Sequence, residues 1–302
     1  FAKVSYILMM AHLLGKTADG MRKLPVTLLS FLVTLLPMML ILKEPDLGTS
    51  LVFLAVWVGL VFWYGVPGLL LVGAGSAALS ALFSFYSETV ADSPWPWAIY
   101  LLVLLGGLYL SRLGVVAAVF LLITNITTGI GIPFLWDKLK GYQQERILTF
   151  FDPTRDAFGT GYQAIQSKVA IGTGGLFGTH YLQGTQKGLA FLPERHTDFI
   201  FSVLGEELGF FGAIFLLMLF MVILWWGLHH ATVARQPFAR FVAIGVVSYF
   251  LFHMVTNVAI TTGLLPVTGL PLPMISYGGS NLLTSSILIG LLMNVSARSF
   301  ND

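Results

Sequence analysis

Long apolar stretches alternate with short polar ones along most of the chain. Nine apolar segments can be marked: Phe1–Leu14, Pro25–Leu42, Leu47–Tyr64, Val66–Phe85, Trp95–Leu110, Gly114–Leu135, Phe199–Leu228, Phe241–Gly263 and Ile275–Val295. A helix that crosses a bilayer needs about 20 mostly apolar residues. The first and fifth segments are short, but the others approach or exceed that length. The pattern predicts an all-α, polytopic transmembrane helix bundle with about nine spans.

The composition supports lipid as the solvent of most of the chain. Of the 302 residues, 56% are hydrophobic and only 10% are charged, whereas a soluble domain usually carries about 25% charged residues. The formal net charge of +2 is too small to indicate a nucleic-acid partner. Cysteine is absent, which excludes a disulfide framework and a thiol-based metal site.

The charged residues of the short connections predict an orientation. Lysine and arginine favour cytoplasmic loops, and most of them in the short connections lie on one side of the predicted bundle: Lys16, Arg22 and Lys23; Arg112; Arg235 and Arg240; and Arg298. We therefore expect these connections and the C-terminal end to be cytoplasmic. Phe1 would then begin outside, inside a truncated first segment, so we expect an N-terminal span to precede it.

One connection, from Trp136 to Asp198, is far longer than the others and faces outward in this topology. It holds seven Lys/Arg and six Asp/Glu, close to half of all charges in the chain. Loops of this length are usually functional. Tyr162–Val169 has the spacing of a short amphipathic helix, so we expect a large, structured extracytoplasmic loop over 136–198. The glycines of Gly172–Gly178 are typical either of turns or, with a weaker signal, of a backbone that binds phosphate.

The end of this loop carries its densest polar run, Glu194-Arg195-His196-Thr197-Asp198, directly before an apolar segment. Thr197 or Asp198 could cap the following helix, or Asp198 could be a reactive carboxylate at the membrane boundary. Glu206 lies two turns further along, roughly below Asp198 at helical spacing. An acid at membrane depth usually faces a polar interior. Glu206 could therefore line a cavity that opens outward, or it could form structural hydrogen bonds with neighbouring helices.

Two further stretches interrupt the apolar pattern on the predicted outer side. Lys43–Gly48 is predicted to be a tight polar turn that contains Asp46. It could be a simple connecting turn, or its acidic residues could form a wall of the same cavity. Leu265–Met274 is apolar yet rich in proline, and irregular backbone at such depth is tolerated only where protein or a watery cavity covers it. Ser276, Gly278 and Ser280 follow at a helix start, where backbone donors favour an anion. The histidines His229, His230 and His253 indicate no catalytic site.

Together these features resemble the SEDS family of shape, elongation, division and sporulation proteins. Four blocks carry the resemblance, in matching order and spacing: Glu44–Ser50, Gly161–Lys168, Leu192–Phe199 and Pro271–Ser280. Arg195 and Gly184-Thr185-Gln186 are more similar to the elongation branch than to the division branch. Phe1-Ala2-Lys3 resembles the end of the family's Ser-Glu-Phe-Ala-Lys stretch. The family has ten spans, so the resemblance implies a single SEDS domain over 1–302 that lacks its first span.

The resemblance implies a peptidoglycan glycosyltransferase of the bacterial inner membrane that acts in elongation and shape maintenance. Its substrate would be lipid II, a disaccharide-pentapeptide on undecaprenyl pyrophosphate, and its partner a class B penicillin-binding protein that crosslinks the peptides. The family's essential aspartate falls on Asp198. The other candidate site residues are Gln163, Gln166, Lys168, Arg146, Glu194, Arg195, His196, Asp46, Glu206, Ser276, Gly278 and Ser280.

A mechanism follows as a hypothesis. Asp198 would take the proton of a sugar C4 hydroxyl as it attacks, and the pyrophosphate would leave with the help of Lys168, Arg195, Arg146 and the glycine-rich backbone. A divalent cation such as Mg²⁺ or Mn²⁺ could share that task. An α-linked donor and a β-1,4 product imply a single inverting displacement. The alternatives are a lipid II flippase or another transporter, and a scaffold for the crosslinking enzyme.

Overall fold

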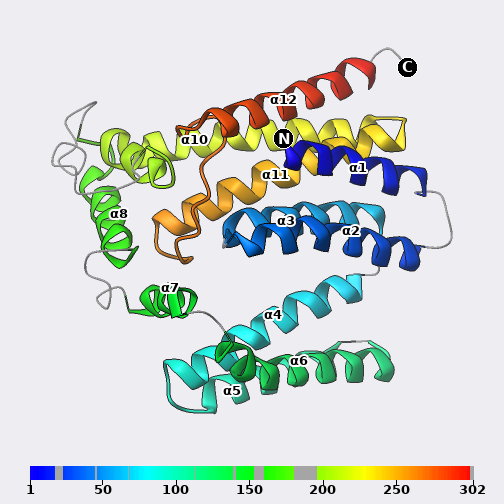
Figure 1. Cartoon of the computed structure of the whole chain (residues 1–302), viewed down its shortest axis with the longest axis vertical. Coiled ribbons are helices and arrows are strands. Elements are labelled where there is room, and N and C mark those ends of the chain that lie inside the picture. Colours follow the sequence, from blue (N-terminus) through cyan, green and yellow to red (C-terminus); the bar gives the residue numbers. More distant parts are fainter. Residues whose placement is uncertain are drawn as a thin grey trace. The chain divides into compact units, whose positions relative to one another are not determined.

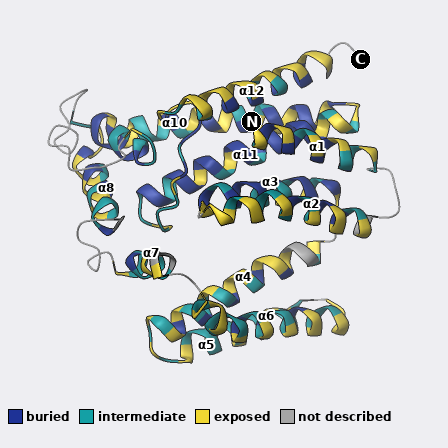
Figure 2. Ribbon diagram, viewed as in Figure 1, coloured by how far each residue is buried: buried dark blue, intermediate teal, exposed yellow. Residues whose placement is uncertain are grey.

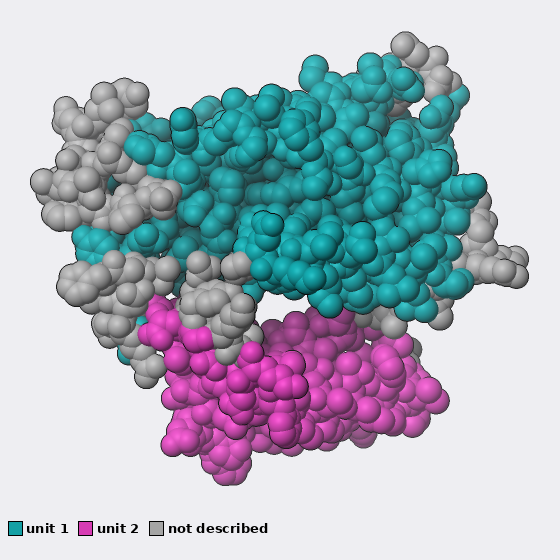
Figure 3. Space-filling view, in the orientation of Figure 1, with its two compact units in different colours: residues 1–64, 152–302 teal, residues 65–151 magenta. Residues whose placement is uncertain are grey.

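The computed structural model describes residues 1–17, 23–44, 46–66, 68–111, 113–138, 141–152, 160–179 and 196–299. Within these ranges the side chains of residues 23, 24, 70, 71, 142, 143, 146, 160 and 299 are not described. The elements in the described ranges are helices, without a β-strand. The chain divides into two compact units, unit 1 (Phe1–Tyr64 and Asp152–Asp302) and unit 2 (Gly65–Phe151), which Figure 3 colours separately.

The helices follow the predicted segments closely (Figure 1). Unit 1 contains α1 (Ala2–Lys16), α2 (Lys23–Lys43), α3 (Leu47–Tyr64), α8 (Thr160–Gly174), α10 (Ile200–Val233), α11 (Pro237–Thr261) and α12 (Gly279–Ser299). Unit 2 contains α4 (Gly68–Thr89), α5 (Trp95–Leu110), α6 (Val115–Trp136) and α7 (Gly141–Phe151). Each of the nine predicted apolar segments corresponds to a helix, although α12 begins only at Gly279, and the loop helix predicted at Tyr162–Val169 is confirmed as the longer α8. The sequence pattern missed α7.

Six of the described helices are long and apolar enough to cross a membrane: α2, α3, α6, α10, α11 and α12. The outer faces of such helices carry large apolar side chains, among them Leu36, Phe62 and Trp225, which are 69%, 67% and 75% exposed. Water would oppose that exposure and lipid favours it. These observations confirm a multi-pass helical membrane protein. The full count of nine spans, which includes α1, α4 and α5, stays a prediction.

Helix α11 is the centre of unit 1. It packs against α1, α3, α10 and α12, and its residues from Phe241 to Val247 are all buried (Figure 2). Small residues let the neighbouring backbones approach it: a Cβ at Gly59 of α3 would lie 2.0 Å from Ser248 Oγ, and one at Gly245 would lie 2.7 Å from Ile7 Cγ2. Such small residues are typical of membrane helix interfaces, where close van der Waals contact drives association.

Helix α10 is bent at Gly209, whose φ of 66° and ψ of −165° are not helical. Its 34 residues would reach about 51 Å as a straight helix, well beyond a hydrocarbon core of about 30 Å. The bend separates a short first part, Ile200–Leu208, from a remainder of spanning length. Glu206 and Glu207 lie on this short first part. The prediction that Glu206 lies two turns into this helix is confirmed, but the predicted segment Phe199–Leu228 is not one continuous helix, because it bends at Gly209 just after the two acids.

In unit 2, a polar seam joins α4, α5 and α6. Asn125 of α6 is fully buried, and its Nδ2 donates to Ser76 Oγ at 3.0 Å and to Leu121 O at 2.8 Å. The Tyr100 hydroxyl donates to Asn125 Oδ1 at 2.8 Å. Inside an apolar bundle these groups have no water to bond, so each needs a protein partner. Asn125 thereby links three helices through one side chain.

We predict that Asn125→Ala destabilises the protein by about 1–2 kcal/mol, the range measured for hydrogen bonds between membrane helices. The measurement is thermal unfolding in detergent. Thr127→Ala on the same helix is the matched control, because the exposed Thr127 hydroxyl bonds only its own helix at Ile123 O. Equal melting temperatures for the two variants would contradict the importance of the seam.

Candidate functional site

The described parts of the four sequence blocks that carry the resemblance come together at one end of unit 1. At this end lie the start of α10, the end of α11, the start of α12 and helix α8 (Figure 1). The start of α3 joins them, since a Cβ at Gly48 would lie 2.3 Å from Thr268 O in the connection between α11 and α12. Segments more than 200 residues apart in the sequence thus form one site.

The turn His196–Phe199 directly precedes α10, and three of its carbonyls in a row accept hydrogen bonds from the C-terminal part of the chain. Tyr277 N donates to His196 O at 2.8 Å, and Ser276 Oγ donates to Thr197 O at 2.6 Å. The Asn257 amide donates to Asp198 O at 2.8 Å. These bonds fix the main chain that carries Asp198.

The Asp198 side chain lies beside the connection between α11 and α12. The N-cap residue of α10 is Phe199, which has no side-chain cap bond, so neither Thr197 nor Asp198 occupies the N-cap position that the alternative gave them. Asp198 is partly exposed. Its Oδ2 lies 3.6 Å from the position that a Cβ would take at Gly269. The carboxylate therefore faces the connection between α11 and α12 and is neither buried in the core nor fully in solvent.

Three residues one turn apart on α11, two through side chains and one through its carbonyl, hold the surrounding segments. Asn257 Nδ2 also donates to Leu270 O at 2.8 Å, and His253 Nδ1 lies 3.0 Å from Pro271 O. Thr261 O, one turn further, accepts a bond from Ser167 Oγ of α8 at 2.6 Å. The irregular, proline-rich segment predicted for Leu265–Met274 is confirmed, and α11 supplies partners for its carbonyls, as irregular backbone at membrane depth requires.

Helix α8 brings the second block to the site. Ser167 Oγ lies 2.5 Å from Ser202 Oγ in the first turn of α10. Next to it, the Lys168 side chain covers Gly263, where a Cβ would lie 1.9 Å from Lys168 Cε and 2.4 Å from its Nζ. Gly263 follows the C-terminal end of α11, whose dipole favours a cation. Gln163 and Gln166 are partly exposed on the same helix.

The glycines after α8 serve packing. A Cβ at Gly174 would lie 2.0 Å from Gly205 O, and one at Gly178 would lie 2.1 Å from Glu207 O. The Thr179 amide donates to Glu206 O at 3.0 Å, and the Phe210 amide donates to Gly175 O at 2.9 Å. The segment is joined to α10 at its bend. Packing therefore accounts for Gly174 and Gly178, and the suggested role of this glycine-rich backbone in binding phosphate stays a prediction.

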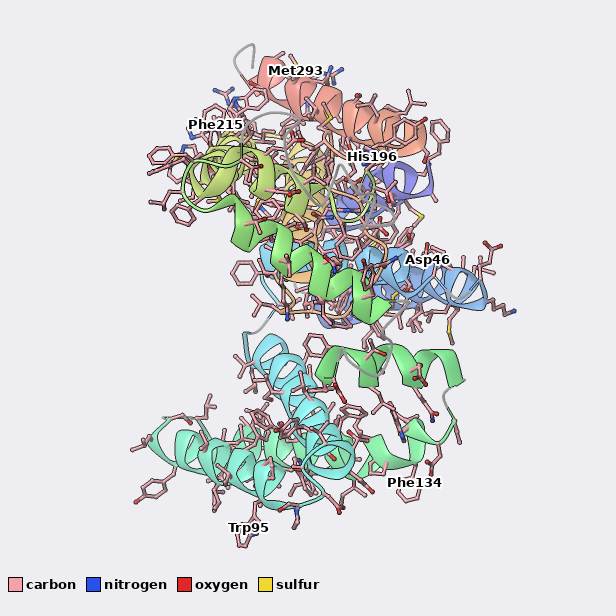
Figure 4. The ribbon with its side chains drawn as sticks, turned by 90° about the vertical axis from the view of Figure 1, so that its left-hand side faces the viewer. Asp46, Trp95, Phe134, His196, Phe215 and Met293 are labelled. Atoms are coloured by element: carbon pink, nitrogen blue, oxygen red, sulfur yellow. The ribbon has the colours of Figure 1, made fainter. Side chains whose placement is uncertain are left out.

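Asp46 caps the start of α3 and interacts electrostatically with Lys3. Its Oδ1 accepts a bond from Thr49 N at 2.8 Å, which caps α3. The ammonium of Lys3 attracts Asp46 and lies 5.7 Å above the ring of Tyr249. Sequence reasoning did not single out Lys3 as a site residue, although its place in the Phe1-Ala2-Lys3 stretch was a signal that it could have used. Figure 4 labels Asp46 and His196.

The remaining candidates divide into three groups. Ser276 is buried, and its hydroxyl oxygen is bonded to Thr197 O and to Leu272 N, the latter at 2.7 Å. Gly278 and Ser280 lie at the start of α12, and Glu206 is fully buried on the first part of α10. Glu194, Arg195, the segment Gly184-Thr185-Gln186 and the side chain of Arg146 lie outside what the structure describes.

Two observations concern other sites. Among the described residues, no three His, Asp or Glu side chains are grouped as a metal site would need.

Unit 2 has a cleft of about 520 Å³ between the ends of α4, α5 and α6, lined by Glu88, Asp92 and Trp97 among others. None of the predicted site residues lines this cleft.

Comparisons with known proteins agree with this arrangement. The profile of the FtsW/RodA/SpoVE family, described as cell cycle proteins, matches residues 1–93 and 97–301. The chain is 36% identical to the peptidoglycan glycosyltransferase RodA of Treponema pallidum, covering 99% of this chain and 74% of the relative. It is 34% identical to the peptidoglycan glycosyltransferase MrdB of Escherichia coli, covering 97% and 66%. The chain thus spans about two thirds of the E. coli relative's length.

Solved structures have the same fold. One chain of a peptidoglycan synthase complex, described as coordinating polymerization and crosslinking, superposes with a TM-score of 0.64 at 30% identity, over 100% of this chain and 70% of that one. A mutant of the rod shape determining protein RodA of Thermus thermophilus superposes with a TM-score of 0.53 at 24% identity, over 100% and 66%.

We predict that Gly178→Ala weakens the junction between the end of α8 and the bend of α10. The φ of Gly178 is +81° and its Cβ would meet Glu207 O, so strain and clash should together cost at least about 2 kcal/mol. Thermal unfolding measures the loss.

Two glycine controls separate the causes. Gly172→Ala lies in α8 with open space around it and should be neutral or slightly stabilising. Gly175→Ala has open space but a φ of +53°, so it reports backbone strain alone. A Gly178→Ala variant as stable as Gly172→Ala would show that the junction does not need this glycine.

Proposed function

The chain belongs to the FtsW/RodA/SpoVE family of cell cycle proteins, and from that premise we propose that it is a peptidoglycan glycosyltransferase that polymerises lipid II into β-1,4 glycan strands. The observation that carries the proposal is the position of Asp198. It is a partly exposed carboxylate on a turn whose main chain is held by three hydrogen bonds, where the described parts of the four blocks meet.

In the proposed reaction, the C4 hydroxyl of one sugar attacks the anomeric carbon of another, whose bond to pyrophosphate breaks. The hydroxyl is a poor nucleophile at neutral pH, so Asp198 accepts its proton as the new glycosidic bond forms. The configuration inverts in one displacement, and no covalent enzyme intermediate is required. The relatives from T. pallidum and E. coli, both described as peptidoglycan glycosyltransferases, support this activity.

The leaving pyrophosphate gains negative charge, which cationic groups stabilise. Lys168 is the first candidate, because it lies at the end of α11 on a helix joined to the start of α10. Lys3, which attracts Asp46, is a second. A divalent cation such as Mg²⁺ or Mn²⁺ could share the charge, but among the described side chains no group of three carboxylates or imidazoles supports a site for it.

The orientation and partner belong to the same proposal. With nine spans and the basic connections in the cytoplasm, the site faces outward from the bacterial inner membrane, together with the loop 136–198. Lipid tails would stay in the bilayer while sugars react at its surface. The synthase complex that this chain resembles coordinates polymerization with crosslinking, which supports a class B penicillin-binding protein as partner. The elongation branch is supported by the RodA and MrdB relatives.

A lipid II flippase is the second candidate, since buried acids such as Glu206 and Glu207 also suit a transporter. A scaffold for the crosslinking enzyme is the third. Strand synthesis by the purified protein in detergent separates the three, because it requires no membrane to cross and no crosslinking partner.

We predict that Asp198→Asn lowers the rate of glycan strand synthesis from purified lipid II by about 10²- to 10⁴-fold, the contribution of a general base. The substitution keeps the shape of the side chain and removes its basicity. Asp137→Asn, an exposed aspartate at the end of α6, is the control and should retain the wild-type rate. Strand synthesis by Asp198→Asn at the wild-type rate would rule out this assignment.

We further predict that Lys168→Gln slows strand synthesis by about 10-fold or more, because a developing negative charge loses its stabilising cation. Lys168→Arg keeps the charge and should retain most of the rate. The exposed Lys138, changed to Gln, controls for the loss of one positive charge. Equal rates for Lys168→Gln and Lys168→Arg would show that the charge at this position is not used.

A further inference from the structure

We propose that Asn257 is a positioning residue, which acts by fixing the main chain of Asp198 and the opposite wall of the site with one amide group. The inference rests on the proposed function, since it assigns Asn257 a role in the reaction that Asp198 performs. Asn257 was not among the residues that the sequence pattern singled out.

The two hydrogen bonds of Asn257 join the main chain of Asp198 to the connection that the Asp198 carboxylate faces. Nδ2 donates at 2.8 Å to Asp198 O, in the turn before α10, and at 2.8 Å to Leu270 O, in the connection before α12. Leu270 is the neighbour of Gly269, the residue that the carboxylate faces. One side chain therefore sets the spacing between the base and the wall beside it.

Asn257 can fix this spacing because its own position is rigid. It is fully buried within the most enclosed helix of unit 1. One turn beyond it, Ile260 packs against Phe199, the last residue of the turn, and Val267 packs against both. These apolar contacts hold the turn against α11, and the hydrogen bond from the Asn257 amide fixes the position of the Asp198 main chain.

The amide group is retained at a cost. Among the residues that the structure describes, none bonds to the buried Asn257 Oδ1, and an unpaired buried group of this kind is unfavourable by about 1–3 kcal/mol. A leucine here would avoid that cost but would leave the carbonyls of Asp198 and Leu270 without this donor. The two N–H donors of the amide, which bond to Asp198 O and Leu270 O, are therefore the reason for an asparagine at this position.

The first experiment compares strand synthesis by the full chain carrying Asn257→Ala with that of wild type. We expect kcat to fall by about 10- to 100-fold, as for a small misplacement of a reacting group, with KM within about twofold. Asn125→Ala is the matched control: it also removes a fully buried, doubly donating asparagine, but from unit 2. It should lose stability and keep its kcat, both measured below its melting temperature.

A second measurement reports position without activity. The chain has no cysteine, so His196→Cys gives one attachment point for a spin label on the turn. The label should become more mobile when Asn257→Ala is added and should not change when Asn125→Ala is added. If Asn257→Ala does not fold, Asn257→Asp, which keeps the volume and removes the donors, takes its place in both measurements.

The outcomes distinguish a failure of the proposed glycosyltransferase function from a failure of the positioning role of Asn257. If wild type makes no strands, the proposed function fails, and the label alone decides whether Asn257 fixes the turn. If wild type makes strands, an unchanged kcat in Asn257→Ala, or an equal fall in Asn125→Ala, overturns the positioning role. An unchanged label mobility overturns it as well.

Discussion

The site depends on the hydrogen bonds that satisfy the backbone of the turn His196–Phe199. Irregular backbone at the end of an apolar bundle has little water to bond, so its carbonyls need donors from the protein. Tyr277 N, Ser276 Oγ and Asn257 Nδ2 supply them to three residues in succession. Because the donors come from two other segments, satisfying the turn also assembles the site.

Helix α11 connects this assembly to the packing of the bundle. One side of it lies against α1 and α3 through small residues that permit close contact. Its C-terminal turns carry His253, Asn257 and Thr261, whose polar groups bond to the neighbouring segments. The positions of the site residues are thus set by the same helix that forms the core of unit 1. A substitution that shifts α11 relative to α3 should therefore also displace Asn257 and the Asp198 turn that it holds.

Much of the architecture could be predicted from the sequence, because membrane helices are signalled by long apolar runs. Each of the nine predicted segments corresponds to a helix. The bend of α10 could not be foreseen, because Gly209 stands among other glycines in an apolar run and nothing local distinguishes it. The role of Asn257 was also hidden, because a lone asparagine in an apolar segment gives no hint of the carbonyls that fold against it. Ser276 was predicted as a ligand residue, and only the fold shows its hydroxyl bonded to Thr197 O and Leu272 N.

The rigidity of the turn bears on the choice between an enzyme and a transporter. Alternating access requires the elements around a binding site to separate and close again. Here the Asp198 turn is bonded to α11 and to the connection before α12, and its last residue packs on Ile260. Moving these segments apart would break several hydrogen bonds at a depth where little water can replace them. A base must instead be held within a fraction of an ångström of its productive position. The cost of breaking this arrangement therefore favours chemistry at Asp198 over passage past it.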